Sequence, residues 1–179
     1  EHDDVEIRNV VTFGVANFAS AAENHQLLVQ EEVLEPLIFL VGTDDTEAQL
    51  RATAALRGLA CDGTIRTQIV EEGGLEPLLR LAQSDDVAVQ QEVLACLCNL
   101  SLSGCIGDQH RDIVKAVNVP ALVNFLCSAD TTYRLFGAVT LGNLASAAEH
   151  QGDIMGGGDM GSGGMGAVFQ RYTHQCLNP

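Results

Sequence analysis

The sequence repeats itself with a period of about 40 residues, and this feature restricts the fold more than any other. Three similar segments occupy residues 26–40, 67–81 and 112–126, and their prolines, Pro36, Pro77 and Pro120, lie 41 and 43 residues apart. A repeat of this length with a helical composition indicates an α-solenoid. In such a fold each unit has an apolar face that only a neighbouring unit can cover.

A second motif recurs in nearly the same phase as the prolines. Its copies occupy residues 15–19, 56–60, 97–101 and 141–145, and three of the four have asparagine at the centre. The central residues are Asn17, Gly58, Asn99 and Asn143, at steps of 41, 41 and 44. Two motifs in phase predict about three full repeats, with partial repeats at both ends.

Each unit is predicted to contain three helices. The first is short, as in 65–72, and ends at Gly73-Gly74, where glycine supplies the left-handed backbone that stops a helix. The second begins near Leu75 with Pro77 in its first turn, where the missing N–H costs little. The third and longest helix is expected at 5–22, 46–61, 86–102 and 130–147.

The spacing of apolar residues and the position of acidic residues both support the prediction of the third helices. In the copy at 86–102 the apolar positions fall on one helical face, which we expect to be buried: Val89, Val93, Leu94, Leu97 and Leu100. An acidic turn precedes each full copy, at Asp44-Asp45, Asp85-Asp86 and Asp130. Aspartate caps helix N-termini and its charge suits the positive end of the helix dipole, so these acids are predicted to be caps.

These features resemble the armadillo repeat family over about residues 5–155. The closest match is Ile69-Val-Glu-Glu-Gly-Gly-Leu-Glu-Pro-Leu-Leu79 together with Ala95-Cys-Leu-Cys-Asn-Leu-Ser101. The resemblance implies an all-α, armadillo-type α-solenoid, a right-handed superhelix of three-helix repeats. The chain departs from the family pattern at Gly58, at Glu32-Val33 in place of Gly-Gly, and in having no Trp.

The expected organisation follows from the repeat phase. We expect a disordered N-terminal end at 1–4, a partial repeat at 5–22, repeats at about 24–62, 63–103 and 104–148, the start of another at 149–155, and a glycine-rich flexible tail at 156–179. The chain starts with Glu1 instead of Met, which is typical of a fragment or a trimmed chain.

The resemblance also implies where a partner would bind. In armadillo proteins the third helices line a concave groove, in which an asparagine ladder holds the backbone of an extended peptide, since a carboxamide both donates and accepts hydrogen bonds. The candidate groove residues are Val10, Phe13, Asn17, Arg51, Arg57, Glu92, Asn99, Phe136 and Asn143. The alternative is that the asparagines only bond the adjacent repeat. The missing Trp argues against binding nuclear-import cargo.

Net charge and cysteine content indicate the class of partner and the cellular compartment. The net charge is −15, which disfavours binding to nucleic acid or anionic membranes. It favours a protein or peptide partner with basic residues; the alternative is that the acidic residues only keep the chain soluble. No apolar run is long enough to cross a membrane, and no signal peptide is present. The six Cys show no disulfide framework, which favours a reducing compartment, the cytoplasm, with the nucleus as the alternative.

No catalytic, cofactor or metal site is predicted. Cys96 and Cys98 point about 200° apart on a helix, and Cys61, Cys96, Cys98 and Cys127 are expected to act as small hydrophobic residues. The tail matches the glycine-rich loop of protein kinases from Gly161 to Val168, but no Lys follows Lys115. The chain is therefore predicted to be a non-catalytic scaffold; the alternatives are the armadillo region of a larger protein such as a kinase, and a structural spacer.

Overall fold

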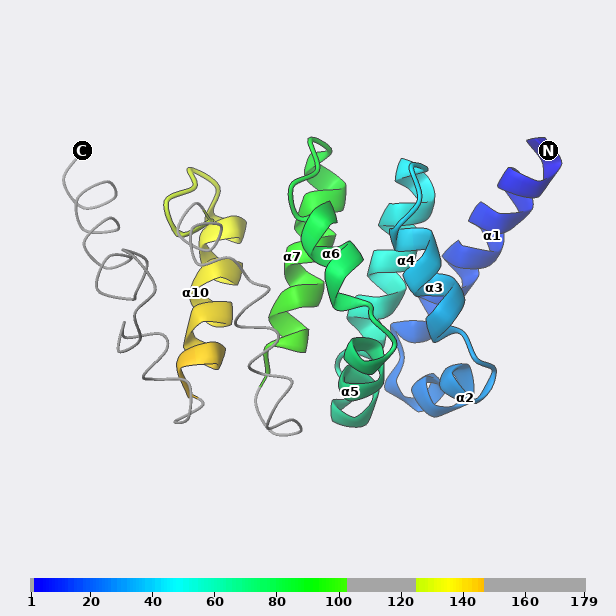
Figure 1. The fold of residues 1–179 in the computed structure, drawn as a ribbon, viewed down its shortest axis with the longest axis horizontal. Coiled ribbons are helices and arrows are strands. Elements are labelled where there is room, and N and C mark those ends of the chain that lie inside the picture. The colour runs from blue at the N-terminus through cyan, green and yellow to red at the C-terminus, as the bar shows by residue number, and fades with distance from the viewer. Residues whose placement is uncertain (1, 103–124, 147–179) are drawn as a thin grey trace. The chain divides into compact units, whose positions relative to one another are not determined.

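The computed structural model describes residues 2–102 and 125–146, and every regular element in these ranges is a helix (Figure 1). The chain divides into two compact units, Glu1–Leu100 and Ser101–Pro179, which are considered separately below. Among the described helices, none combines the length and the apolar character needed to span a bilayer. The expected helices at 112–126, the segment at 149–155 and the tail at 156–179 lie wholly or largely outside the described residues.

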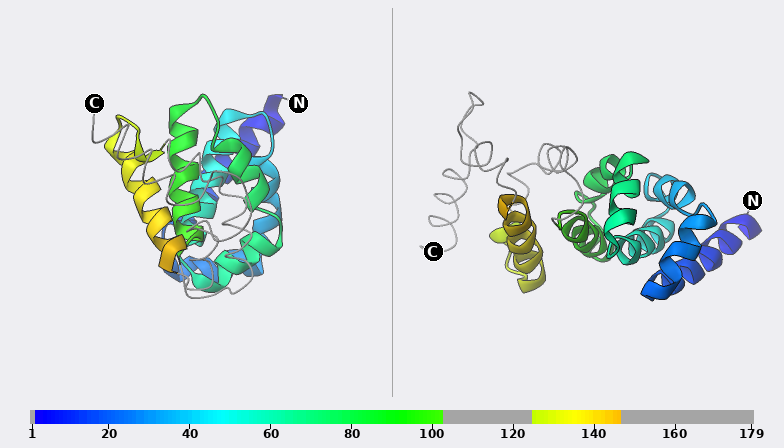
Figure 2. Two further views of the ribbon diagram at one scale, coloured as in Figure 1. Left: turned by 60° about the vertical axis from the view of Figure 1, so that its left-hand side comes forward. Right: turned by 90° about the horizontal axis from the view of Figure 1, so that it is seen from below.

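The first unit contains a lone long helix followed by two three-helix repeats. In chain order its elements are α1 (His2–Ala19), η1 (Ala22–Asn24), α2 (His25–Gln30), α3 (Leu34–Val41), α4 (Thr46–Leu59), α5 (Gly63–Glu71), α6 (Leu75–Leu81) and α7 (Val87–Leu100). The long helices α1, α4 and α7 lie side by side in that order, with α3 packed on α4 and α6 on α7 (Figures 1 and 2). The second unit contributes α10 (Thr131–Ser146).

The predicted three-helix plan is confirmed, with shifts at the helix ends. The helix α1 begins at His2, inside the segment 1–4 that was expected to be disordered, and ends at Ala19 instead of residue 22. The third helices α4 and α7 each end two residues earlier than expected. Short polar turns take up these residues, as at Ser20, whose N–H bonds the Asn17 carbonyl.

The core of the first unit is aliphatic, as the composition requires. All five apolar positions predicted for the inner face of α7 are buried. On α4 the buried face is built largely from alanine, with Ala48, Ala52 and Ala55 fully enclosed. Because alanine adds little width to a helix, this face lets neighbouring helices approach α4 closely. Large aliphatic side chains then fill the space between repeats: Leu56, Leu59, Ile65, Ile69, Leu78 and Leu100.

The acidic turns cap the long helices, as predicted. The Asp45 carboxylate accepts hydrogen bonds from the backbone N–H groups of Glu47 and Ala48, at 3.0 and 3.1 Å. The bond from Ala48 contributes most to lowering the pKa of Asp45, and the neighbouring Arg8 guanidinium lowers it further. Asp86 accepts the same pair of bonds, from Ala88 and Val89, and Asp130 accepts one, from Thr132. Each of the three long helices therefore begins at the residue that follows its capping aspartate.

The first helix of each repeat in this unit ends in a left-handed residue. After α5 this residue is Gly73, at φ 82°, and the next N–H, of Gly74, bonds the Ile69 carbonyl at 2.8 Å. In the preceding repeat Glu32 takes the same position with φ 55°. Glu32-Val33 therefore replaces Gly-Gly without changing the left-handed turn, and α2 ends just before this turn, at Gln30.

Glutamate at a left-handed position carries a steric cost, because its Cβ crowds the following carbonyl. Replacing Glu32 with glycine is expected to raise the free energy of unfolding by about 1 kcal/mol. Urea denaturation followed by far-UV circular dichroism measures the change. The matched control is Glu31→Gly, where φ is −86° and glycine only adds flexibility to the unfolded chain, so that variant is expected to lose stability. Equal shifts for the two variants would contradict the explanation.

Candidate groove on the long helices

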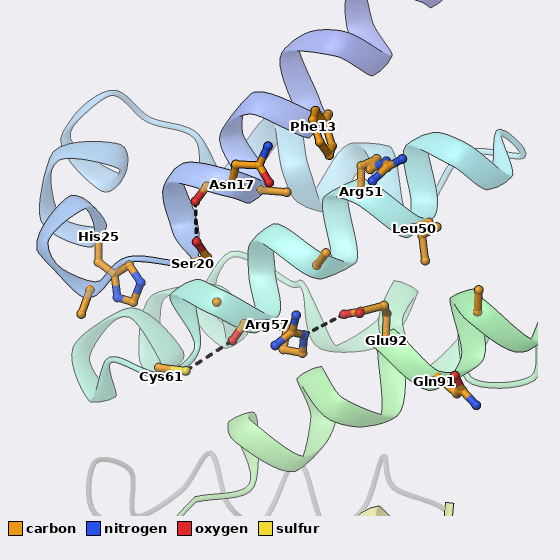
Figure 3. A pocket seen from close by; sticks show the side chains of 15 residues that line it. Phe13, Asn17, Ser20, His25, Leu50, Arg51, Arg57, Cys61, Gln91 and Glu92 are labelled. Carbon is orange, nitrogen blue, oxygen red and sulfur yellow. Dashed lines mark hydrogen bonds and ion pairs between the residues drawn. The ribbon is translucent and has the colours of Figure 1, made fainter. Parts of the chain in front are cut away.

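A groove of about 650 Å³ runs along the surface where α1, α4 and α7 lie side by side (Figure 3). Its lining includes several small residues, among them Ala16, Ala54 and Gly58. The structure brings five of the nine predicted groove residues together in its lining: Phe13, Asn17, Arg51, Arg57 and Glu92. A sixth, Val10, lines an adjoining hollow of about 440 Å³ together with Phe13 and Arg51.

The predicted asparagine ladder is used differently from one position to the next. The Asn99 side-chain Nδ2 donates to the Arg57 carbonyl at 3.0 Å and lies 3.6 Å from the Cys61 Sγ. In the second unit the Asn143 Nδ2 donates to the Ser101 Oγ at 3.1 Å. Both asparagines thus bond residues of the preceding repeat, which is the alternative that the sequence left open.

Two other predicted groove residues, Asn17 and Phe136, have different surroundings. Asn17 is exposed in the groove, and no hydrogen bond of its carboxamide is found within the described residues. Phe136 belongs to α10 in the second unit, where it is half-buried, and it is not part of the groove lining. Of the predicted ladder residues, the lining of this groove contains Asn17 and does not include Asn99.

Gly58 interrupts the ladder for a steric reason. A Cβ at this position would lie 2.4 Å from the Ala19 carbonyl oxygen and 2.9 Å from its carbon, closer than any side chain tolerates. The same carbonyl accepts a hydrogen bond from the Nε2 of His25, at 2.9 Å, and since a carbonyl only accepts, this nitrogen carries the proton. The close approach of α1 to α4 thus requires glycine where the other copies have asparagine.

The contact made by His25 recurs one repeat later with a different residue. Arg66 occupies the equivalent position, 41 residues on, and its Nη1 donates to the Ala60 carbonyl at 3.1 Å and to the Cys61 carbonyl at 3.3 Å. Both side chains are buried. The residue at this position therefore satisfies a carbonyl at the C-terminal end of the preceding long helix, which explains why a polar side chain is buried there.

Two arginines of α4 line the groove and each is held by a glutamate. The Arg57 Nε donates to the Glu92 Oε2 at 2.7 Å, which joins α4 to α7 across the groove (Figure 3). The Arg51 Nε donates to the Glu47 Oε1 at 2.7 Å, one turn earlier on the same helix. The Arg51 guanidinium carbon also lies 4.6 Å from the centre of the Phe13 ring, which is a cation–π contact between α4 and α1.

Cys61 and His25 line the groove although sequence reasoning did not select them. Cys61 was expected to be a small hydrophobic residue within a helix, but it is exposed because α4 ends at Leu59. The signal that could have found it is its spacing, three residues after Gly58 on the ladder face. Cys96 behaves as predicted: it is buried, and burial raises the pKa of its thiol.

The different surroundings of two asparagines lead to a stability prediction. Replacing Asn99 with alanine is expected to lower the free energy of unfolding by about 1 kcal/mol, because the hydrogen bond from its side chain to the Arg57 carbonyl is lost. Replacing Asn17 is expected to change it by less than about 0.5 kcal/mol, since its side chain is exposed. Chemical denaturation of the two single variants gives both values. A larger loss for Asn17→Ala than for Asn99→Ala would contradict the hydrogen-bond assignment.

Within residues 2–102 and 125–146 no group of three or more His, Cys, Asp or Glu side chains is placed to hold a metal ion. The histidine and the cysteine in the lining each bond a backbone carbonyl. His25 bonds that of Ala19, and the Cys61 Sγ lies 3.8 Å from that of Arg57. What the lining offers is a hollow with several small residues, the aromatic ring of Phe13 and paired charges.

Comparison with known proteins gives one family match and a set of similar folds. The model of the armadillo/beta-catenin-like repeat matches residues 65–102. A search of curated protein sequences found no match. The 38 matched positions run from within α5 to just beyond α7, so the family match covers nearly all of one structural repeat.

Several solved structures share the fold. A designed armadillo repeat protein, YIII(Dq)4CqI, is 23% identical with a TM-score of 0.71, over 78% of this chain and 58% of that one. An engineered protein is 31% identical with a TM-score of 0.70, over 77% and 56%. A designed armadillo repeat protein in complex with the peptide (KR)4 is 22% identical with a TM-score of 0.68, over 76% and 57%.

The chain thus spans a little over half the length of each of these three structures. The repeat period, the three-helix units, the matched repeat at residues 65–102 and the shared fold all agree. On this evidence the chain has the α-solenoid fold of armadillo-repeat proteins, and residues 65–102 match one armadillo/beta-catenin-like repeat.

Proposed function

We propose that the chain is a non-catalytic scaffold that holds an extended segment of another protein in the groove on α1, α4 and α7. The observation that carries the proposal is that three successive long helices line one continuous hollow of about 650 Å³. Ala16 and Ala54 in the lining are small, so the backbone of a bound segment has room to approach α4. The exposed carboxamide of Asn17 offers a donor and an acceptor to that backbone.

The structural relatives support binding of this kind. One designed armadillo protein of the same fold is described as a complex with a peptide, and another as designed for modular peptide recognition. The armadillo fold is typically a non-catalytic scaffold. The glycine-rich match that begins at Gly161 lies outside the described residues, so the kinase alternative gains no support from the groove.

The expectations about the partner rest on different observations. The net charge of −15 argues against nucleic acid, as the sequence already indicated. It also favoured a basic partner, but the charged residues in the groove lining are two arginines and one glutamate, which do not form an acidic surface. A cytoplasmic location, or a nuclear one, stays a prediction from the cysteine content.

The test selects peptides and then blocks the groove. Random octapeptides displayed on phage are selected against the full chain, and affinities of the winners are measured by fluorescence anisotropy. Ala88→Tyr places a large side chain at an exposed position in the lining, and is expected to weaken binding at least about tenfold. The matched control is Val87→Tyr, on the adjacent residue of α7, which is exposed but outside the lining, and it should leave affinity unchanged.

Two results would overturn the proposal. One is a selection that yields no binding peptide, which favours the structural spacer. The other is equal affinity of the parent chain and Ala88→Tyr for every selected peptide, which would place the binding surface elsewhere. Unchanged thermal melting of both tyrosine variants is required before their affinities are compared, and because both positions are exposed we expect melting to be unaffected.

A further inference from the structure

We infer that the groove on α1, α4 and α7 recognises a segment with aspartate or glutamate side chains. This inference rests on the proposed function and names the chemistry of the bound segment. Of the three charged residues in the lining, Arg51 and Arg57 are cationic and only Glu92 is anionic. Both arginines project from α4, the central helix, so a segment lying along the groove has to pass them (Figure 3).

Arg57 is only partly satisfied by its glutamate. A guanidinium has five N–H donors, and the single bond to Glu92 uses the Nε. No further hydrogen bond of the Arg57 side chain is found within the part of the chain that the structure describes. The side chain is 41% exposed and its partner 30%, so both ends of the pair are open to the groove. The terminal nitrogens are therefore available to a second carboxylate.

Arg51 is oriented by two contacts and is open in the same way. Its Nε bonds Glu47, and one face of its guanidinium lies against the Phe13 ring. These contacts fix the plane of the group in advance, which lowers the entropy lost when a ligand is bound. The side chain is 35% exposed, and in the described residues its terminal nitrogens have no hydrogen-bond partner. An arginine held in this way is suited to a carboxylate, which its fork of N–H groups contacts at two points.

The net charge of the chain does not oppose this inference. Charges more than about 8–10 Å from a bound side chain are largely screened at physiological ionic strength, so the residues in contact decide the preference. In an extended segment alternate side chains face the same way. A segment with an acid at every second residue would present its carboxylates to α4 while the other side chains face solvent. The preferred ligand is thus opposite in charge to the (KR)4 peptide of the designed protein.

The test uses three fluorescein-labelled octapeptides that differ only at alternate positions: (Glu-Thr)4, (Gln-Thr)4 and (Lys-Thr)4. Threonine favours an extended backbone, and glutamine has nearly the shape of glutamate without its charge. Anisotropy titrations with the full chain are expected to show (Glu-Thr)4 binding about tenfold more tightly than (Gln-Thr)4, with (Lys-Thr)4 weakest. The preference should decrease as salt is raised.

Three variants test whether the groove residues cause the preference for (Glu-Thr)4. Arg51→Gln is expected to remove most of the difference between (Glu-Thr)4 and (Gln-Thr)4. Glu92→Gln should have the opposite effect and tighten (Glu-Thr)4 severalfold, because it releases Arg57 from its competing carboxylate. The double variant Arg57→Gln with Glu92→Gln removes the pair together, so no unpaired glutamate remains to repel the peptide, and it should again weaken (Glu-Thr)4.

The control for a general loss of positive charge is Arg80→Gln. Arg80 is exposed on α6 and is not part of the groove lining, so this variant should bind all three peptides as the parent chain does. Equal or tighter binding of (Gln-Thr)4 or (Lys-Thr)4 by the parent would overturn the inference, as would the same loss for Arg80→Gln as for Arg51→Gln. If none of the three binds while a phage-selected peptide does, the acidic preference is wrong and the scaffold proposal stands; if no peptide of either kind binds, both are wrong.

Discussion

Replacing Leu59 with alanine is expected to lower the free energy of unfolding of the first unit by about 3–4 kcal/mol, while Phe18→Ala costs less than about 1 kcal/mol. The two residues occupy the same position of the repeat, 41 residues apart. Leu59 is fully buried, whereas Phe18 is 62% exposed. The difference therefore comes from what covers the helix and not from the size of the side chain removed.

The bare face of α1 explains this contrast. Ile7 and Val11 are 62% and 58% exposed, whereas their counterparts on α4, Ala48 and Ala52, are fully buried. On α4 this face packs against α3 of the same repeat, and no helix within the described residues plays that role for α1. Apolar surface that is already exposed in the folded protein contributes little to its stability.

The measurement is urea denaturation followed by far-UV circular dichroism, because the chain has no Trp for fluorescence. Leu59→Ala should move the midpoint to clearly lower urea, and Phe18→Ala should leave it nearly unchanged. Similar shifts for the two variants would show that the exposed face of α1 is covered in solution.

Replacing Gly58 with alanine is expected to lower the free energy of unfolding by about 2 kcal/mol. Alanine is favoured over glycine within a helix by about 1 kcal/mol, so the substitution would normally stabilise α4. Here the added Cβ meets the Ala19 carbonyl oxygen, which is backbone and cannot rotate away. The helices α1 and α4 then have to separate, which also strains the bond from His25 to the same carbonyl.

Gly14 is the matched control for this prediction. It lies within α1, and a Cβ there would meet nothing within 4 Å. Gly14→Ala is therefore expected to stabilise the chain by about 1 kcal/mol. The two variants are compared in the same denaturation experiment, with opposite signs expected. A stable Gly58→Ala protein would mean that α1 does not approach α4 as closely as the structure indicates.

Much of the fold could be predicted because the period of the sequence is the period of the structure. The prolines, the acidic turns and the long apolar faces each have a local physical reason, and they place the helices to within a few residues. The end of α2 was uncertain because Glu32 stands where glycine was expected, yet the chain keeps the left-handed turn. A steric cost of this size is too small to move a helix end when the flanking residues are packed.

The groove was less predictable because it depends on contacts between repeats. Position alone suggested that Asn99 faces a ligand, but its bond to the Arg57 carbonyl is only evident once α4 and α7 are placed. Gly58 departs from the motif because of a contact with Ala19 of α1, 39 residues earlier in the sequence. The net charge likewise misrepresents the groove, since most acids lie outside its lining.

The buried polar residue early in each first helix has a consequence for exchanging repeats between proteins. His25 bonds the carbonyl of Ala19, and Arg66 that of Ala60, so the ends of α1 and α4 are each completed by a side chain that follows in sequence. A module cut at the turn after Ala19 or Ala60 would lose this donor to its neighbour. The physical boundary of a repeat in this chain lies after residue 25 or 66, and any recombination of its units should keep that residue with the helix it completes.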